Sequence, residues 1–596
     1  MQKEIAILDF GGQYTHLIAR RIRNLGIFSE IYQPEEFEFK THIAGIIFSG
    51  GPQSVNAKDA YRIKWSIEKS SVPVLGICYG HQLIAHKIGG LIESGSNKEY
   101  GYAEIDCYDQ TAIFKDTAFK QKVWMSHGDH VVKLPSGYEI LAATDQVPIA
   151  AYKSDDDKIF GVQFHPEVSH TEFGYKILDN FLNICTDRRD WRVDNFKNEL
   201  IESVRKQAGD NDLLILLSGG VDSLVAMELC LAAIGKKRVF AIHIDTGFMR
   251  YQESDNIVNH LQELGYDNLK LIDAEDVYLR ELKDIFEPEA KRLIIGRLFV
   301  EIANNAIAEF NRDNILLVQG TIYPDTIESG DSAKSAKIKT HHNRVKEIEK
   351  LLAEGKIIEP IRELYKDEVR KLGIELGIPE ELVNRHPFPG PGLAIRILTS
   401  DSTTVIPYDN TETAKLEEII KNRNFKAEIL PIRSVGVMGD FRTYHHPVLL
   451  SYRSNNVQNW QELRIAARMT INSFSSVNRA LFAIMEQKES YSLKKHRLTK
   501  IACDQLRQVD HLLMQRVKPI EEIWQMPVVQ LPLFDHQGRQ VYVMRPVTSI
   551  DAMTADFYEM DFDFLRELVL EVKKLPFVAD LFYDITSKPP ATIEWE

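Results

Sequence analysis

The chain has 596 residues, of which 44% are apolar and 27% charged, a composition typical of globular proteins. Its formal net charge of −14 disfavours nucleic-acid binding as the main function. The sequence shows no signal-peptide pattern and no apolar stretch of the roughly 18 residues that span a membrane, and its five cysteines lack the spacing of a zinc site or a disulfide framework. These features predict a cytoplasmic enzyme of several domains.

Short apolar runs alternate with helical patterns over residues 1–185. This alternation predicts an α/β domain whose sheet has much parallel pairing. The polar stretch 185–196 is expected to link this domain to the next. The expected strands are 4–10, 43–52, 72–80 and 159–168, and the first expected helix is 14–26.

The stretch "LGICYGHQ" (75–82) has the form G-x-C-x-G, the thiol counterpart of the nucleophile elbow. Its glycines permit a tight strand-to-helix turn, and the helix dipole favours the thiolate of Cys78. In "FHPEV" (164–168), His165 and Glu167 lie two residues apart, so on extended chain their side chains point to one face. Taken singly, these residues fit a buried cysteine and a strand histidine. Their combination favours a catalytic centre.

These motifs, together with "FSGGP" (48–52) and "SHGDHV" (126–131), resemble the class I, triad-type glutamine amidotransferases. In that family a cysteine attacks the carboxamide of glutamine, forms a glutamyl thioester and releases ammonia. The resemblance implies that Cys78 is the nucleophile, His165 the base and Glu167 the carboxylate that orients the base. It also implies that the backbone N–H groups of Gly51 and Tyr79 bind the oxyanion and that Gln82 helps to seat glutamine.

A second α/β run begins where "DLLILL" (212–217) leads into "SGGVDS" (218–223) and a helical pattern. A strand, a glycine turn and a helix start make a phosphate cradle, because free backbone N–H groups meet the helix dipole there. The lysine of a Walker motif is absent. Further strands are expected at 238–247 and 314–323, so we expect a doubly wound parallel sheet.

The "SGGVDS" loop resembles the signature of the ATP pyrophosphatases, which cleave ATP between its α- and β-phosphates. In those enzymes the loop and Mg²⁺ take up the charge of the leaving pyrophosphate, so no lysine is required. The resemblance implies Asp222 as the Mg²⁺ ligand, and Asp325 and Glu328 are further candidates for metal or nucleotide contacts. The implied ATP-binding residues are Ser218, Gly219, Gly220, Val221, Asp222 and Ser223.

The proline-rich stretch "HPFPGPGLAIR" is expected to break regular structure and mark a boundary. Beyond it the sequence predicts two similar hairpins, each with a glycine at its turn. The hairpins are expected at 427–453, around Gly439 and Asp440, and at 525–547, around Gln537 and Gly538.

The similarity of the two hairpins predicts an α+β C-terminal region with two similar subdomains. These are expected at about 401–455 and 520–596, with a helical insert between them. The expected domains are therefore an amidotransferase at 1–188, an ATP pyrophosphatase at 189–400 and the C-terminal region at 401–596.

Nearly the whole chain resembles the glutamine-hydrolysing GMP synthetase family, through "GTIYPDTIES", "KTHHN", "HPFPGPGLAIR", "RSVGVMGD", "MTADF" and "SKPPATIEWE". The resemblance implies that ATP adenylylates the 2-oxo group of xanthosine monophosphate (XMP) and that ammonia from glutamine then displaces AMP to give GMP. It implies a mobile lid at Lys339, Thr340, His341, His342 and Asn343. It also implies XMP contacts at Arg292, Asp440, Arg442, Gln525, Lys588, Thr592, Ile593 and Glu594, with Lys588 at the phosphate.

The enlarged C-terminal region departs from the shorter members of that family, which have one hairpin module and dimerise through it. Two modules in one chain, as in the longer form typical of eukaryotes, would mimic this dimer. We therefore expect a monomer, and a homodimer stays open if the extra segment is only a helical addition. The expected partners are XMP, ATP with Mg²⁺, and glutamine, with neither nucleic acid nor membrane.

Other enzymes use similar modules on other acceptors. NAD synthetases share the pyrophosphatase loop but pair it with a glutaminase whose triad is Glu-Lys-Cys. Asparagine synthetases need an N-terminal cysteine, whereas Gln2 follows Met1 here, and a tRNA-modifying enzyme needs a basic groove. A non-catalytic, regulatory or scaffolding relative would be expected to have lost the cysteine nucleophile or the "SGGVDS" loop. Both are intact in this sequence.

Overall fold

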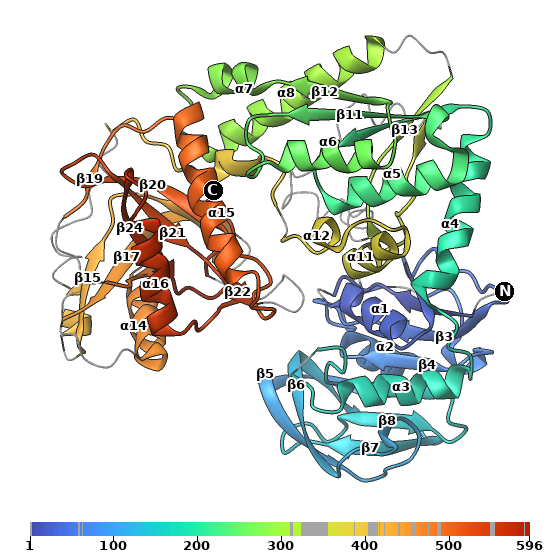
Figure 1. Ribbon diagram of the computed structural model, residues 1–596. Coiled ribbons are helices and arrows are strands. Elements are labelled where there is room, and N and C mark those ends of the chain that lie inside the picture. The colour runs from blue at the N-terminus through green and yellow to red at the C-terminus, as the bar shows by residue number, and fades with distance from the viewer. Residues whose placement is uncertain are drawn as a thin grey trace. The chain divides into compact units, whose positions relative to one another are not determined.

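The computed structural model forms two compact units, Met1–Asn198 and Glu199–Glu596 (Figure 1). It describes residues 3–596 except 13, 58–59, 62, 169, 310–313, 324–355, 387, 403–414, 417, 422, 439–440, 454–458, 475, 486–489, 549–554 and 589. Within the described ranges, no helix is long and apolar enough to cross a membrane. The domain boundaries expected near 188 and 400 stay predictions.

The first unit is built on one nine-stranded sheet with the order β2-β1-β3-β4-β9-β8-β7-β5-β6. The first five strands pair in parallel and the rest antiparallel, which confirms the predicted α/β fold. Strands β3 and β4 are buried throughout, as expected for parallel strands covered on both faces. The strands are β1 Glu4–Leu8, β2 Phe28–Tyr32, β3 Ile43–Phe48, β4 Val74–Ile77, β5 Leu91–Cys107, β6 Lys120–Lys133, β7 Tyr138–Ala143, β8 Ala151–Ser154 and β9 Ile159–Val162.

Helix α1 confirms the helix expected at 14–26. In α1, the buried residues Ile18, Ala19 and Ile22 recur at helical spacing, so one face of the helix packs inward. The helices are α1 Thr15–Asn24, α2 Tyr79–Lys87 and α3 Gly174–Cys185, with short 3-10 turns at Ile67–Lys69 and Ala112–Phe114.

The second unit begins with a five-stranded, wholly parallel sheet in the order β12-β11-β10-β13-β14. Chain order reverses between β10 and β13, which confirms a doubly wound sheet with its switch point beside the end of β10. The strands are β10 Asp212–Leu217, β11 Val239–Asp245, β12 Leu269–Asp273, β13 Ile315–Val318 and β14 Ile357–Ile358. The helices are α4 Val193–Ala208, α5 Val221–Ile234, α6 Glu253–Glu263, α7 Glu275–Leu282, α8 Pro288–Glu309, α11 Lys366–Glu375 and α12 Glu380–Val383, with 3-10 turns at Lys236–Arg238 and Gly392–Ile395 (η4).

An eight-stranded mixed sheet completes this unit in the order β15-β17-β18-β24-β21-β20-β19, with β16 paired to β17. Alternate strand residues face two cores: Leu450 and Phe482 pack with the helices, whereas Leu449 and Leu481 pack on the other face with Trp595. The strands are β15 Phe425–Ile429, β16 Ser434–Met438, β17 Phe441–Tyr452, β18 Val477–Ala483, β19 Ser492–Leu493, β20 Val528–Phe534, β21 Gln540–Met544 and β24 Val578–Asp584. Helices α14 Trp460–Ser473, α15 Lys500–Val517 and α16 Phe562–Val572 belong to this region, as do the paired strands β22 Val547–Thr548 and β23 Asp556–Phe557.

Both predicted hairpins are present as antiparallel strand pairs, and the turn expected at Gly439 and Asp440 lies outside the described residues. The two halves of this region also repeat one arrangement of elements. Strands β16 and β17 pair antiparallel, as do β20 and β21. In each half a helix then leads to a strand parallel to the second hairpin strand: β18 beside β17 and β24 beside β21. The halves join through the antiparallel pair β18 and β24, so the C-terminal region forms one continuous sheet.

The predicted helical insert between the subdomains is wrong in one respect. Strand β18 lies within 455–520, so α14 and β18 complete the first subdomain. The described elements between the two subdomains are the short strand β19 and helix α15. Every residue of β18 is buried in the middle of the sheet. Its sequence therefore lacks the alternation of a half-exposed strand and cannot be told from a buried helix by periodicity.

Candidate active sites

Cys78 sits on a sharp turn between β4 and α2, with φ 52° and ψ −104°. Non-glycine residues rarely adopt a positive φ, and strain of this kind is typical of a nucleophile elbow. A Cβ atom on Gly76 would lie 2.6 Å from the backbone of Gly80, and one on Gly80 would lie 2.4 Å from the carbonyl oxygen of Phe48. Glycine is therefore required on both sides of Cys78.

His165 and Glu167 form a buried pair just after β9. His165 Nδ1 lies 2.7 Å from Glu167 Oε1, and the side chains are 6% and 0% exposed. A Cβ atom on Gly50 would lie 3.2 Å from His165 Cε1 and 3.7 Å from Cys78 Cβ, so both side chains border the same glycine. The structure thus brings the three predicted catalytic residues together.

The electrostatics of this group favour a protonated imidazole. Burial by itself lowers the pKa of His165, but the carboxylate of Glu167 and the sulfur of Cys78 outweigh it and raise the pKa to about 10. At neutral pH this favours an imidazolium beside the cysteine, which is the arrangement that stabilises a thiolate nucleophile.

The residues predicted to bind glutamine surround Cys78. The N–H of Gly51 has no acceptor within the described part of the chain, and Tyr79 is the first residue of α2. Gln82 is 3% exposed, and its Nε2 donates to Asp129 O at 2.7 Å and to Gln163 Oε1 at 3.1 Å. Gln163, which the sequence analysis missed, also places Nε2 3.8 Å from Cys78 Sγ.

The "SGGVDS" loop connects β10 to α5 at the switch point of the parallel sheet. Gly219 has φ +79°, and a Cβ atom there would lie 2.6 Å from Met249 Cε. Helix α5 has no side-chain cap, so its first N–H groups face the loop. Ser223 Oγ donates to Gly220 O at 3.0 Å and lies 3.3 Å from Ser218 Oγ. Such a turn can bind the phosphates of a nucleotide.

Asp222 forms an ion pair that the sequence analysis missed. Its Oδ2 lies 2.5 Å from Nζ of Lys366 on α11, whereas its buried Oδ1 has no partner among the described residues. Arg385 and Glu253, 3.0 Å apart and mostly buried, form a second pair close to Gly219. No local pattern marks these residues, because they come from separate helices and loops.

The residues predicted to bind XMP gather around the stretch 590–596. Gln525 Nε2 donates to Glu594 Oε1 at 3.1 Å, and Arg396 binds Glu594 through two nitrogens at 2.8 and 3.1 Å. Arg292 on α8 donates to the backbone oxygen of Glu596. Thr592 donates to Val435 O at 3.0 Å, Ile593 is half-buried, and the backbone of Lys588 pairs with Ala555.

Several predicted residues lie outside the described ranges. The backbone of Arg442 lies in β17, but its side chain is not among those described. The others are Asp325, Glu328, the lid residues Lys339, Thr340, His341, His342 and Asn343, and Asp440.

Comparison with known proteins identifies both centres by class. Residues 6–185 match the family model "Glutamine amidotransferase class-I" and residues 192–325 match "NAD synthase". The chain therefore joins an amidotransferase to an ATP pyrophosphatase. Residues 513–595 match "GMP synthase C terminal domain".

Curated relatives narrow this class to one family. Over the full length of both chains, ours is 42% identical to a probable glutamine-hydrolysing GMP synthase of Leptospira interrogans. It is 37% identical to the glutamine-hydrolysing GMP synthase of Aquifex aeolicus and 38% identical to that of Caldicellulosiruptor saccharolyticus, again over all of each chain. The chain belongs to the glutamine-hydrolysing GMP synthase family. It is accordingly a ligase that takes nitrogen from glutamine and uses ATP to aminate XMP to GMP.

Proposed function

We propose that the chain makes GMP with two sets of residues, Cys78 with its partners for glutamine hydrolysis and the 218–223 loop for the activation of XMP. The observation that carries the first assignment is the strained elbow that holds Cys78 beside the His165–Glu167 pair. The position of the loop at the switch point of a parallel sheet supports the second.

At the amidotransferase site, the thiolate of Cys78 attacks the carboxamide carbon of glutamine. The N–H groups of Gly51 and Tyr79 stabilise the oxyanion, and His165 gives its proton to the departing ammonia. A glutamyl thioester remains. His165 then removes a proton from water, which attacks the thioester and releases glutamate while the thiolate is restored. Glu167 holds the imidazole and stabilises its positive charge.

At the pyrophosphatase site, the 2-oxo group of XMP attacks the α-phosphorus of ATP and pyrophosphate leaves. The loop N–H groups, Ser218 and Ser223 bind the leaving pyrophosphate. Ammonia then adds to C2 of the purine and AMP departs, giving GMP. The adenylate is required because an oxo group is a poor leaving group by itself. Gln525, Lys588 and the stretch 592–594 hold XMP.

Mg²⁺ fits this loop through the carboxylate of Asp222, because Oδ1 is buried without a partner among the described residues. No cluster of three or more His, Cys, Asp or Glu side chains suits a metal within the described ranges. Mg²⁺ commonly binds through one or two carboxylates plus substrate phosphates, and it would neutralise charge on the leaving pyrophosphate.

We further propose that the chain is a cytoplasmic monomer with no nucleic-acid or membrane partner. The continuous sheet supports the oligomeric assignment, because the two subdomains already pair through β18 and β24 within one chain. Sedimentation at micromolar concentration tests it, since a monomer has the mass of one 68.3 kDa chain.

The reaction is tested by product analysis of purified protein with Mg·ATP, glutamine and XMP. GMP, AMP and pyrophosphate are expected in equal amounts, and only when XMP is present. ADP in place of AMP would contradict the proposed role of the loop. A control in which nicotinate adenine dinucleotide replaces XMP should give no AMP, whereas AMP formed only in that control would reject XMP as the acceptor.

Glu167→Gln is expected to lower the pKa of His165 and to reduce glutamine-dependent synthesis by about 10²- to 10⁴-fold, because the imidazolium loses its carboxylate. The folded-state pKa of about 10 exceeds the ordinary value of 6.5, so the pair stabilises the fold fully below pH 6.5 and its contribution is lost as pH rises towards 10. Urea unfolding at pH 7 and 9.5 should show a larger loss of stability in the wild type than in this variant. Glu104→Gln serves as the control, because the side chain of Glu104 is 59% exposed. If the wild type and Glu167→Gln lose the same free energy of unfolding between pH 7 and pH 9.5, the His165–Glu167 pair does not stabilise the fold in this way.

A further inference from the structure

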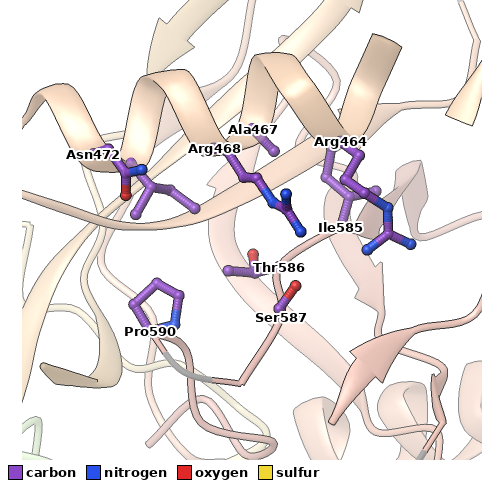
Figure 2. A pocket seen from close by; sticks show the side chains of 9 residues that line it. Arg464, Ala467, Arg468, Asn472, Ile585, Thr586, Ser587 and Pro590 are labelled. Atoms are coloured by element: carbon purple, nitrogen blue, oxygen red, sulfur yellow. The ribbon is translucent and has the colours of Figure 1, made fainter. Parts of the chain in front are cut away.

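One cavity of the C-terminal region has no role in the chemistry described so far. It has a volume of about 260 Å³ and lies between α14 and the stretch that follows β24 (Figure 2). Its polar lining residues include Arg464, Arg468 and Asn472 on α14, and Thr586 and Ser587 opposite them. The cavity is therefore formed by the first subdomain on one side and the second on the other.

Among the described residues, no group neutralises the guanidinium of Arg468. The described part of the chain offers it neither an ion pair nor a hydrogen bond, and Figure 2 shows its guanidinium extending from α14 towards Thr586 and Ser587. Arg464 differs, because it pairs with Asp556 at 2.5 Å and with Glu559 at 2.7 Å. A guanidinium with five free donors is suited to the oxygens of a phosphate.

Excess positive charge also lies next to the cavity wall. Arg479 and Arg545 share the single carboxylate of Asp584, at 2.5 and 2.7 Å, and all three side chains are 0% exposed. Arg545 donates to the backbone oxygen of Thr586 at 2.9 Å, while its Nε and Nη2 have no partner among the described residues. This buried triad carries one net positive charge beside Thr586, whereas Arg464 with Asp556 and Glu559 carries one net negative charge. The charge of Arg468 therefore makes the surroundings of the cavity positive, which favours an anion there.

We propose that this cavity binds a phosphate monoester and that Arg468 is its principal ligand. The volume is below the roughly 300–1,000 Å³ of pockets that enclose whole drug-sized ligands, so it suits a phosphate with an adjoining sugar better than a complete nucleotide. The amide of Asn472 adds a neutral hydrogen-bonding group, whereas the hydroxyl of Ser587 already donates to Asp556 Oδ1 at 2.9 Å.

Two sources of this phosphate are compatible with the same chemistry. Ser587 and Pro590 line the cavity and flank Lys588, which the proposed function places at the phosphate of XMP. If the cavity holds the phosphate of XMP, the inference rests on the proposed function. Arg468 would then favour XMP over its nucleoside, xanthosine, because the nucleoside lacks the phosphate. The other source is a separate small phosphate monoester that binds while XMP is present.

The test compares the wild type with Arg468→Gln in the full-length protein. Arg468 is exposed and unpaired in the described structure, so the fold should be unaffected. The matched control is Arg566→Gln, an arginine on α16, the corresponding helix of the second subdomain, which does not line the cavity. Calorimetry with ribose 5-phosphate measures phosphate binding, ribose controls for the sugar, and steady-state kinetics give KM for XMP.

Arg468→Gln should weaken ribose 5-phosphate binding or raise KM for XMP by about 10- to 100-fold, the loss expected for a charged hydrogen bond, with kcat little changed. Competition by saturating XMP would assign the cavity to the phosphate of XMP, and so would a raised KM without measurable ribose 5-phosphate binding. Persistence of ribose 5-phosphate binding would assign a second ligand. If Arg468→Gln changes neither the ribose 5-phosphate affinity nor KM for XMP, the cavity does not bind a phosphate through Arg468. The proposed function is tested separately, by GMP formation in the wild type.

Discussion

Cys78→Ala will abolish glutamine-dependent GMP formation and leave ammonium-dependent formation unchanged. Removal of the sulfur removes the only atom that can carry the glutamyl group, so the loss should reach at least about 10⁴-fold. Ammonium salts bypass this step, because the residues proposed for the adenylylation of XMP lie in the second unit. GMP formation measured with each nitrogen source in parallel gives the comparison.

Cys107→Ala is the matched control for this variant. Cys107 is a second buried cysteine of the same unit, and burial raises the pKa of its thiol to about 11, so it should be inert. This control should keep both activities. Iodoacetamide should label Cys78 in the wild type and block only glutamine-dependent synthesis. Loss of both activities in Cys78→Ala would mean that this cysteine supports the fold rather than the chemistry.

Asp222→Asn should lower GMP formation by about 10²- to 10³-fold with either nitrogen source. The amide removes one negative charge from the loop, leaves Lys366 without its ion-pair partner and weakens the proposed Mg²⁺ ligand. The defect should lie in the first half-reaction. Formation of AMP and pyrophosphate from ATP and XMP in a single turnover, before nitrogen is added, measures it directly.

The control for Asp222→Asn is Asp276→Asn, since Asp276 is an exposed carboxylate in the first turn of α7 in the same unit. It should retain full activity. Raised Mg²⁺ should restore part of the activity of Asp222→Asn if the carboxylate binds the metal. A normal burst of AMP with slow nitrogen transfer would instead place Asp222 outside the adenylylation step.

Most features of the fold and of the candidate sites that could be predicted from the sequence lie in local motifs. The elbow at Cys78 and the loop at 218–223 each consist of a strand, a turn and a helix start that are contiguous in sequence, so their geometry follows from glycine positions and apolar runs. Both hairpins were predictable for the same reason, because turn residues and flanking strands are neighbours in the chain.

Residues that act through distant partners escaped prediction. Lys366 lies far along the chain from Asp222, and nothing in the sequence around it marks the pairing. Strand β18 reads as part of a helical stretch, because burial on both faces removes the alternation that identifies a strand. Gln163 lies beside Cys78 only because β9 pairs with β4.

The stretch 590–596 shows the difference most clearly. Pro590, the preceding Pro589 and Trp595 hint only weakly in the sequence that this stretch is docked. In the structure Trp595 is 0% exposed, its Nε1 donates to Asp584, and the guanidinium of Arg479 lies 4.5 Å from the ring centre.

The candidate nucleophile and the candidate pyrophosphate loop could be recognised from the sequence, since each consists of a few consecutive residues whose conformation is local. The tertiary fold completes these two sites with residues from distant parts of the chain. It joined two subdomains through β18 and β24, set Lys366 against Asp222 and packed Glu594 against Arg396. These contacts depend on burial and charge pairing between segments far apart in the chain, which no local pattern encodes.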